Sequence, residues 1–235
     1  HNSYFVGFLM DGILLLEKQK ETDHYQIQSL PINSGVFCLK KDRFQDVVWI
    51  GTDGQGVYLY SNPLYSIKSM VLSNYTEKIE RPVRAIYLDD ECTFWVGTKG
   101  NGILKIYDYE FDKNISDCRA EVLTTSNSAL SSNAVYCFAK SHRNLLWIGD
   151  EEGLTYYSYR EKRIKSIPIR IGNEDFKYIH DIYETADSEL WLASVGMGVV
   201  KARIAGTPDN PVIVDAQRYV INDGIELFLY YLCGE

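Results

Sequence analysis

The side chains best suited to chemistry in this chain of 235 residues are a histidine–aspartate pair and three runs of carboxylates. His180 and Asp181 are adjacent and have two interpretations. One is a general base or a ligand contact, and the other is a polar pair whose hydrogen bonds are satisfied within the protein. The carboxylates stand at Asp89-Asp90-Glu91, Asp150-Glu151-Glu152 and Glu174-Asp175. A glycosidase requires two carboxyl groups that face each other across a sugar. Because these runs fall in expected loops, we interpret them as solvated turn charge and predict no catalytic residue.

The spacing of the other reactive residues does not indicate a metal, cofactor or nucleotide site. The four histidines show no HExxH spacing, and the five cysteines are odd in number and form no CxxC pair. The glycines at 51–56 superficially resemble a phosphate loop, but a strand is expected where a helix N-terminus is required. Asp11-Gly12 and Asp53-Gly54 lack the other oxygen ligands of a calcium loop. We therefore expect no metal and no cofactor.

Charge and hydropathy exclude two further classes. The net charge is -8 and no basic cluster is visible, whereas nucleic acid requires a positive face that neutralises phosphates. The longest apolar stretch runs from Phe5 to Leu16 and is interrupted by Asp11 and Gly12, so it is too short to span a bilayer. We expect no nucleic acid partner and no membrane span in this segment, and a globular chain that is a mature domain or a fragment of a larger protein.

The elements that must position these residues follow from an internal repeat. The run from Trp49 to Val57, with the letters WIGTDGQGV, is matched by WVGTKGNGI from Trp95, and related runs begin at Trp147 and Trp191. A degenerate copy begins at Phe5. Successive copies are 44, 46, 52 and 44 residues apart. Such a period is typical of the four-stranded blades of a β-propeller.

Each repeat predicts the same order of strands. Apolar first strands are expected at 36–39, 83–86, 135–138 and 179–182, and each is followed by a second strand that carries the tryptophan. Third strands are expected at 57–60, 103–107, 154–159 and 199–204, with weaker fourth strands such as 65–72 and 165–171. The tryptophan is expected to fill the wedge between blades, and the nearby glycine to let a neighbouring backbone approach. Cys38 and Cys137 fall in first strands and are interpreted as small buried hydrophobes.

The fold class is therefore predicted to be all-β, a β-propeller with five visible repeats in a single domain or fragment over 1–235. The N-terminus begins at a second strand, while residues 229–233 resemble a first strand, so the two ends are able to close a five-bladed ring. The other interpretation is an arc of a larger propeller, typically seven-bladed, whose end blades are exposed.

The repeat resembles a known family. Leu-Ser-Ser-Asn-Ala-Val-Tyr at 130–136, Leu-Leu-Trp-Ile-Gly-Asp at 145–150 and Gly-Leu-Thr-Tyr-Tyr at 153–157 are similar to the two-component-regulator propeller repeat. Such repeats form the extracytoplasmic sensor half of hybrid histidine kinase/response regulators, especially in gut Bacteroides, where they sense carbohydrate breakdown products. The resemblance implies a periplasmic sensor domain with an oligosaccharide ligand and a homodimer formed through the parent receptor. It implies no catalysis in this segment, whereas the parent carries the histidine kinase elsewhere.

Ligand contacts are expected where the blade-to-blade loops enter the first strands and the turns between second and third strands emerge. Arginine and asparagine are able to hydrogen-bond sugar hydroxyls or a uronate carboxylate, and tyrosine to stack on a sugar. Each residue also has a purely structural interpretation. Two alternative functions stay open, a propeller glycosidase or lyase and a protein-interaction or dimerisation propeller. The candidate ligand-binding residues are Gln55, Arg81, Arg84, Lys99, Asn101, Asn133, Tyr178 and His180.

Overall fold

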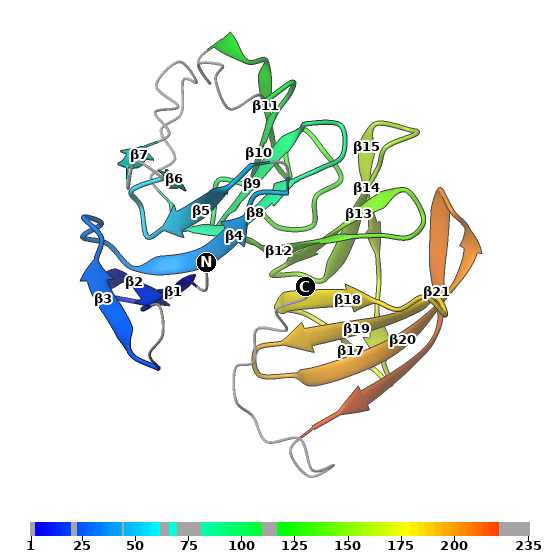
Figure 1. The fold of residues 1–235 in the computed structure, drawn as a ribbon. Coiled ribbons are helices and arrows are strands. Elements are labelled where there is room, and N and C mark those ends of the chain that lie inside the picture. The colour runs from blue at the N-terminus through cyan, green and yellow to red at the C-terminus, as the bar shows by residue number, and fades with distance from the viewer. Residues whose placement is uncertain are drawn as a thin grey trace. The chain divides into compact units, whose positions relative to one another are not determined.

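The computed structural model describes residues 3–19, 23–43, 45–61, 66–69, 81–109 and 117–220. Its named elements are strands arranged in antiparallel sheets (Figure 1). The first sheet has three strands, β1 (Ser3–Phe8), β2 (Gly12–Lys18) and β3 (Tyr25–Ser29). No first strand pairs with it in the described part of the chain, and the sequence predicts that the N-terminal copy begins at a second strand. Residues 229–233, which the sequence offers as that strand, lie outside the described residues.

Four sheets of four strands follow, and in each the strands neighbour one another in the order of the sequence. Their first strands agree with the predicted ones. The strands are β4 (Val36–Lys41), β5 (Val47–Thr52), β6 (Val57–Ser61) and β7 (Ser66–Ser69); β8 (Val83–Leu88), β9 (Phe94–Thr98), β10 (Ile103–Ile106) and β11 (Ala120–Leu123); β12 (Val135–Lys140), β13 (Leu145–Asp150), β14 (Leu154–Ser158) and β15 (Arg163–Ile167); and β18 (Ile179–Glu184), β19 (Glu189–Ser194), β20 (Gly198–Thr207) and β21 (Asn210–Tyr219). The all-β fold of repeated propeller blades is confirmed.

One predicted fourth strand is wrong in its extent. The sequence predicts a single strand at 165–171, but β15 ends at Ile167 and Pro168 follows. Proline has no N–H to continue the ladder, so the chain leaves the sheet at that point. The next residues form β16 (Arg170–Ile171), which pairs with β17 (Glu174–Asp175) in a separate hairpin.

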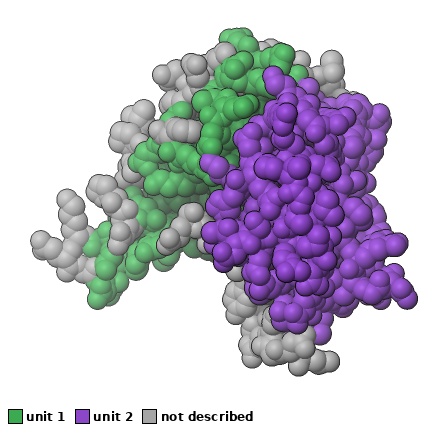
Figure 2. Space-filling model, turned by 90° about the vertical axis from the view of Figure 1, so that its right-hand side faces the viewer, with its two compact units in different colours: residues 1–96, 105–120 green, residues 97–104, 121–235 purple. Residues whose placement is uncertain are grey.

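The chain divides into two compact units (Figure 2). Unit 1 comprises residues 1–96 and 105–120, and unit 2 comprises residues 97–104 and 121–235. The division passes through the sheet of β8 to β11, so it does not separate one set of sheets from another. That the whole chain is one propeller domain stays a prediction.

Three of the four repeat tryptophans are buried as predicted, whereas Trp191 is half-buried. Trp49, Trp95 and Trp147 are each 1% exposed or less. A Cβ added to Gly149 would stand 2.6 Å from the carbonyl oxygen of Ile179, which begins the first strand of the next sheet. Because real Cβ atoms do not approach so closely, only glycine allows the two sheets to pack at this distance.

The buried indoles obtain their hydrogen-bond acceptors in two ways. The Nε1–H groups of Trp49 and Trp95 each donate at 2.9 Å to an aspartate of the same sheet, Asp42 and Asp89 respectively. In the β12–β15 sheet Ser141 stands where the other two sheets have that aspartate. The three positions are equivalent, because each donates its backbone N–H to a carbonyl across the turn between the first and second strands. The acceptor for Trp147 is Glu184, at the end of β18.

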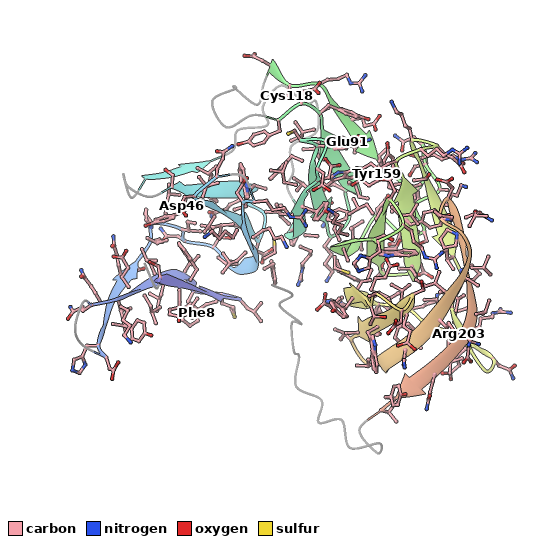
Figure 3. The ribbon with its side chains drawn as sticks, turned by 45° about the vertical axis from the view of Figure 1, so that its right-hand side comes forward. Phe8, Asp46, Glu91, Cys118, Tyr159 and Arg203 are labelled. Carbon is pink, nitrogen blue, oxygen red and sulfur yellow. The ribbon has the colours of Figure 1, made fainter. Side chains whose placement is uncertain are left out.

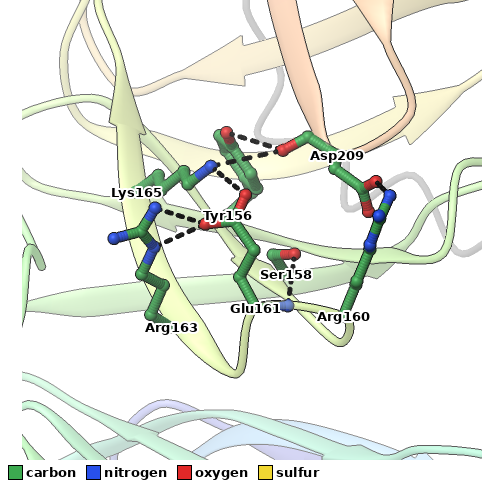
Figure 4. A network of polar contacts seen from close by, with 7 residues as sticks. All are labelled: Tyr156, Ser158, Arg160, Glu161, Arg163, Lys165 and Asp209. Atoms are coloured by element: carbon green, nitrogen blue, oxygen red, sulfur yellow. Dashed lines mark hydrogen bonds and ion pairs between the residues drawn. The ribbon is translucent and has the colours of Figure 1, made fainter.

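The long β20–β21 hairpin is tied to the β14–β15 hairpin within unit 2 (Figure 4). Arg160 contacts the Asp209 carboxylate at 2.5 Å, and the phenol of Tyr156 donates to the main-chain oxygen of Asp209 at 3.4 Å. The Lys165 ammonium group donates to Glu161 at 2.6 Å and to the main-chain oxygen of Asp209 at 3.5 Å. The hairpin tip therefore fixes two consecutive sheets of unit 2 by polar contacts, in addition to their apolar core. Among the described residues no helix is long and apolar enough to cross a membrane.

Candidate ligand-binding site

A β-bulge recurs at the second residue of the first strand. In the β4–β5 pair, Val36 lies opposite Thr52 and Cys38 opposite Gly51, so Phe37 is the extra residue. The same shift in register occurs in two sheets of unit 2 and leaves Tyr136 and His180 as the extra residues. A bulge removes a residue from the regular alternation and turns its side chain in a new direction. We call Phe37, Tyr136, His180 and the equivalent residue of β8, Arg84, the second-position residues.

In unit 1 two second-position residues stack on each other. The guanidinium carbon of Arg84 lies 3.6 Å from the centroid of the Phe37 ring. Arg84 is half-buried, and its Nε atom is buried without a hydrogen-bond partner among the described residues. Stacking engages the face of the guanidinium and leaves its in-plane donors for another group. The pair thus combines an apolar plane with a cation that lacks an acceptor at Nε.

Unit 2 contains the corresponding stacked pair. The rings of Tyr136 and His180 are 4.1 Å apart at their centroids, with an angle of 16° between their planes. Asp181, adjacent to His180, accepts the backbone N–H of Ile182 at 2.8 Å through Oδ1. His180 is therefore held as a planar surface beside an aromatic ring, and one oxygen of Asp181 is engaged with its own strand. This arrangement favours ligand contact over general-base chemistry.

Tyr178 precedes β18 in a strained backbone conformation. Its φ is 55°, and its side chain is 42% exposed. Its N–H donates to the carbonyl of Glu151 at 3.0 Å, and its own carbonyl accepts the N–H of Val195 at 3.2 Å. The turns of two consecutive sheets thus hold a conformation that non-glycine residues adopt only at a cost of about 1–3 kcal/mol. The strain keeps the ring near the start of the strand that carries His180.

Asn133 organises the loop that enters β12. Its carbonyl accepts the N–H groups of both Gly100 and Gly102 at 2.9 Å, and its side-chain Oδ1 accepts the N–H of Thr125 at 2.9 Å. Its role in this structure is to join the 98–102 turn to that loop. Asn101, on the turn, has a buried Oδ1 without a partner among the described residues. Asn101 is therefore the better candidate of the two for binding a ligand through its side chain.

The other three candidates are exposed. Lys99 lies on the same turn as Asn101 and forms an isolated backbone bridge with Ala134. Gln55, in unit 1, donates to the Asn33 carbonyl at 3.4 Å and accepts from the Tyr58 hydroxyl at 3.3 Å. Arg81 stands three residues before Arg84. The structure thus stacks Arg84 on Phe37 in unit 1 and His180 on Tyr136 in unit 2. Lys99 and Asn101 lie together on the 98–102 turn, which is joined to Asn133.

The interpretation of the carboxylate runs as solvated is wrong for two residues. Asp89 and Asp150 are at most 1% exposed, although Glu91, Glu174 and Asp175 are exposed as expected. Asp89 binds the Trp95 indole and two backbone N–H groups. Local sequence could not reveal this, because the need for an acceptor arises from the buried indole.

Asp150 is the other buried carboxylate, and it fastens a loop. It accepts the Ser131 hydroxyl at 2.6 Å and the N–H groups of Glu152 and Gly153 at 2.9 and 3.0 Å. Burial raises the pKa of Asp150, and these hydrogen bonds oppose that rise. Because its oxygens are occupied by the protein, Asp150 is unsuited to the facing pair of a glycosidase. Within the described residues no cluster of histidine, cysteine and carboxylate side chains is able to hold a metal ion.

Sequence reasoning missed Phe37 and Tyr136. Both look like ordinary apolar members of their strands, and strand alternation does not reveal a bulge. One signal was available: in the aligned repeats they occupy the same position as Arg84 and His180, and the four differ in type while their neighbours are mostly small or aliphatic.

The repeated antiparallel sheets are blades of the β-propeller class. Among solved structures, the chain is similar to the extracellular domain of a protein described as a hybrid two-component system of B. thetaiotaomicron. The TM-score is 0.67 and the identity 24%, over 95% of this chain and 27% of that chain. A second such domain from the same organism gives a TM-score of 0.51 and 19% identity, over 93% of this chain and 27% of that one. The resemblance drawn from the repeat motif is confirmed at the level of the fold.

PorZ, a surface component of the type-IX secretion system of Porphyromonas gingivalis, is similar with a TM-score of 0.65 and 14% identity, over 94% of this chain and 33% of that one. No family model matches the chain. By sequence, translation initiation factor 6 of Saccharolobus solfataricus is 29% identical over 140 residues, which are 54% of this chain and 57% of that protein. The chain thus spans little more than half of that relative and about a quarter to a third of the similar solved chains.

Proposed function

We propose that this chain is a ligand-sensing propeller module of a hybrid two-component receptor, outside the cytoplasm in the periplasm, and that it recognises carbohydrate breakdown products without catalysing a reaction. The observation that carries the proposal is the recurrent second-position bulge. It sets planar side chains in stacked pairs, Phe37 with Arg84 and Tyr136 with His180. Flat rings beside hydrogen-bond donors are the usual means of holding a sugar.

Two further observations support this proposal. The domains similar to this chain in fold include extracellular parts of hybrid two-component systems. The deeply buried carboxylates Asp89, Asp150 and Glu184 are each occupied by indole, hydroxyl or backbone donors, and this favours a binding module over a hydrolase.

Isothermal titration calorimetry of the full chain against a panel of neutral and acidic oligosaccharides tests the proposal. We expect one saccharide class to bind, and His180→Ala to weaken it by about tenfold, the loss of roughly 1.4 kcal/mol that one aromatic or polar contact supplies. Arg203→Gln, on the outer part of the last sheet (Figure 3), is the matched control and should bind normally. Absence of binding by both this chain and a longer parent ectodomain would contradict the proposal.

A second candidate function, assembly, is favoured by the outer face of the first sheet. Val6 and Ile27 are 38% and 63% exposed, and Tyr4 and Tyr25 form an edge contact on that face with centroids 5.9 Å apart. The opposite face is covered, since Ile13 and Leu15 are buried in the core of unit 1. Sedimentation of the chain with and without Ile27→Lys tests self-association: the variant should shift a concentration-dependent dimer to monomer, and a monomer at all concentrations in both proteins would contradict it.

A further inference from the structure

We infer that the saccharide is acidic, and that Arg84 binds its carboxylate or sulfate group. The inference rests on the proposed function, because it assigns a chemical class to the ligand of the same site. It makes Arg84 the residue that selects charged over neutral sugars.

The first argument is the missing counter-ion. Arg84 is half-buried on β8, yet no carboxylate lies within ion-pair distance of it among the described residues. Several other arginines are paired, for example Arg43, which lies 3.1 Å from Asp90, and Arg170, which lies 2.8 Å from Asp175. The stack on Phe37 compensates part of the hydration that Arg84 has lost, but it supplies no negative charge, which a bound anionic group would provide.

The Cys38 thiol, an ionisable group on the neighbouring first strand, cannot supply that charge. Cys38, on the adjacent first strand, is close enough for Arg84 to affect its ionisation. Burial nevertheless raises the pKa of the Cys38 thiol to about 12, so the thiol is neutral at physiological pH. Its Sγ instead lies 4.0 Å from the carbonyl oxygen of Val83. The positive charge of Arg84 therefore remains uncompensated by Cys38.

The geometry of the stack suits an anion of planar or tetrahedral shape. With one face of the guanidinium 3.6 Å from the Phe37 ring and Nε buried, the donors that remain are the two terminal nitrogens, whose N–H groups point in the plane of the group. Guanidinium donors in that plane match the two oxygens of a carboxylate or a sulfate ester in a bidentate manner. The Phe37 ring provides an apolar surface beside the charged contact, as expected for the carbon face of a sugar ring.

The test combines nuclear magnetic resonance with calorimetry on the full chain. The Nε–H resonance of Arg84, assigned by its loss in Arg84→Lys, is followed while glucose, glucuronate, glucose 6-sulfate and inorganic sulfate are added separately. We expect glucuronate or the sulfate ester to shift this resonance and glucose to leave it unchanged. The two acidic sugars decide between a carboxylate and a sulfate ester as the recognised group.

Calorimetry uses acidic and neutral members of the oligosaccharide panel with Arg84→Gln, Arg84→Lys and the control Arg203→Gln. Arg84→Gln should lower the affinity for the acidic saccharide by about tenfold to a hundredfold, the range of one charge-assisted bidentate contact. It should also abolish the preference for this saccharide over its neutral analogue. Arg84→Lys should retain part of the preference, because it keeps the charge but not the planar donors. Arg203→Gln should bind as the unaltered chain does.

The outcomes separate this inference from the proposed function. Equal binding of neutral and acidic saccharides, with the Arg84 resonance unmoved, overturns the inference and leaves the sensor function intact. A resonance that responds to inorganic sulfate while no saccharide binds supports an anion contact at Arg84 and overturns the sensing of sugars by this chain. If no shift of the resonance and no heat of binding are observed, both the inference and the sensing of sugars by this chain are overturned.

Discussion

The indole N–H of Trp147 donates to Oε2 of Glu184 at 2.7 Å, and the two residues belong to consecutive sheets of unit 2. The Glu184 side chain is 1% exposed and also lies 3.8 Å from Nε of Arg143. In the two preceding sheets the acceptor comes from the same sheet as the tryptophan. Here Ser141 occupies that place, so the hydrogen bond has become a link between blades.

Removing this acceptor should destabilise the chain. Glu184→Ala leaves a buried indole N–H and the partly buried Arg143 without their partner, and we expect the free energy of unfolding to fall by about 2–4 kcal/mol. Urea denaturation followed by tryptophan fluorescence measures the change. Glu184→Gln retains an oxygen acceptor and should lose about half as much. If the free energy of unfolding of Glu184→Ala lay within about 0.5 kcal/mol of that of the unaltered chain, roughly the effect of a surface change, the link would be unimportant for stability.

The close approach of sheets at Gly149 can be tested by a double-mutant cycle. An added Cβ would lie 2.5 Å from Sγ of Cys137 and 2.6 Å from the Ile179 oxygen, so Gly149→Ala should cost about 1–3 kcal/mol or more. Combining it with Cys137→Ala removes one of the three contacts under 3.0 Å, and the pair should be about 0.5–2 kcal/mol less destabilised than the sum of the single changes. Gly172→Ala is the control: no atom lies within 4 Å, and only the left-handed backbone costs about 1 kcal/mol.

Cys38 should make the chain sensitive to base. Its thiol has a pKa of about 12 in the folded chain against an ordinary value of 9.0, so between these values the folded state keeps a proton that the unfolded state has released. The stabilisation is complete below pH 9 and is lost as the pH rises toward 12. Urea denaturation at pH 8 and pH 10.5 should show a larger loss for the unaltered chain than for Cys38→Ala. Equal losses would mean that the thiol ionises normally in the folded state.

Trp191 should be the tryptophan most open to solvent. It is half-buried, with Lys201 Nζ 5.6 Å from its ring centroid, whereas Trp49, Trp95 and Trp147 are buried. Acrylamide should therefore quench one component of the fluorescence strongly, and Trp191→Phe should remove that component. Uniform quenching of all four tryptophans, or a quenched component that survives the substitution, would contradict the described packing.

The sequence was sufficient for the elements of the fold, because each repeat carries the same local signals. The Trp and Gly positions predict both the second strand and the contact between sheets, and Gly149 meets Ile179 as expected. The exception is the end of β15 before Pro168, which the sequence could have predicted because proline has no backbone N–H to donate. The Gly-rich turns likewise lie where a positive φ is required, for example at Gly56.

The candidate site was only partly predictable, because its side chains are directed by tertiary structure. Arg84 and His180 were identified from their chemistry, but their stacking on Phe37 and Tyr136 depends on a bulge that alternation does not encode. Buried Asp89 was misinterpreted for a related reason: its partner, the Trp95 indole, becomes apparent only in three dimensions. Local patterns predict strands, whereas pairs of side chains require the packed sheets.

The second-position bulge separates two demands that a β-strand normally places on one residue. Val36 and Cys38, on either side of Phe37, keep the register with β5, and Cys38 also contacts the next sheet, while Phe37 is released from the register and stacks on Arg84. Phenylalanine, arginine, tyrosine and histidine all occupy this place in four repeats of the same architecture. The side chain at this place can therefore change from blade to blade while the strands around it keep their pairing.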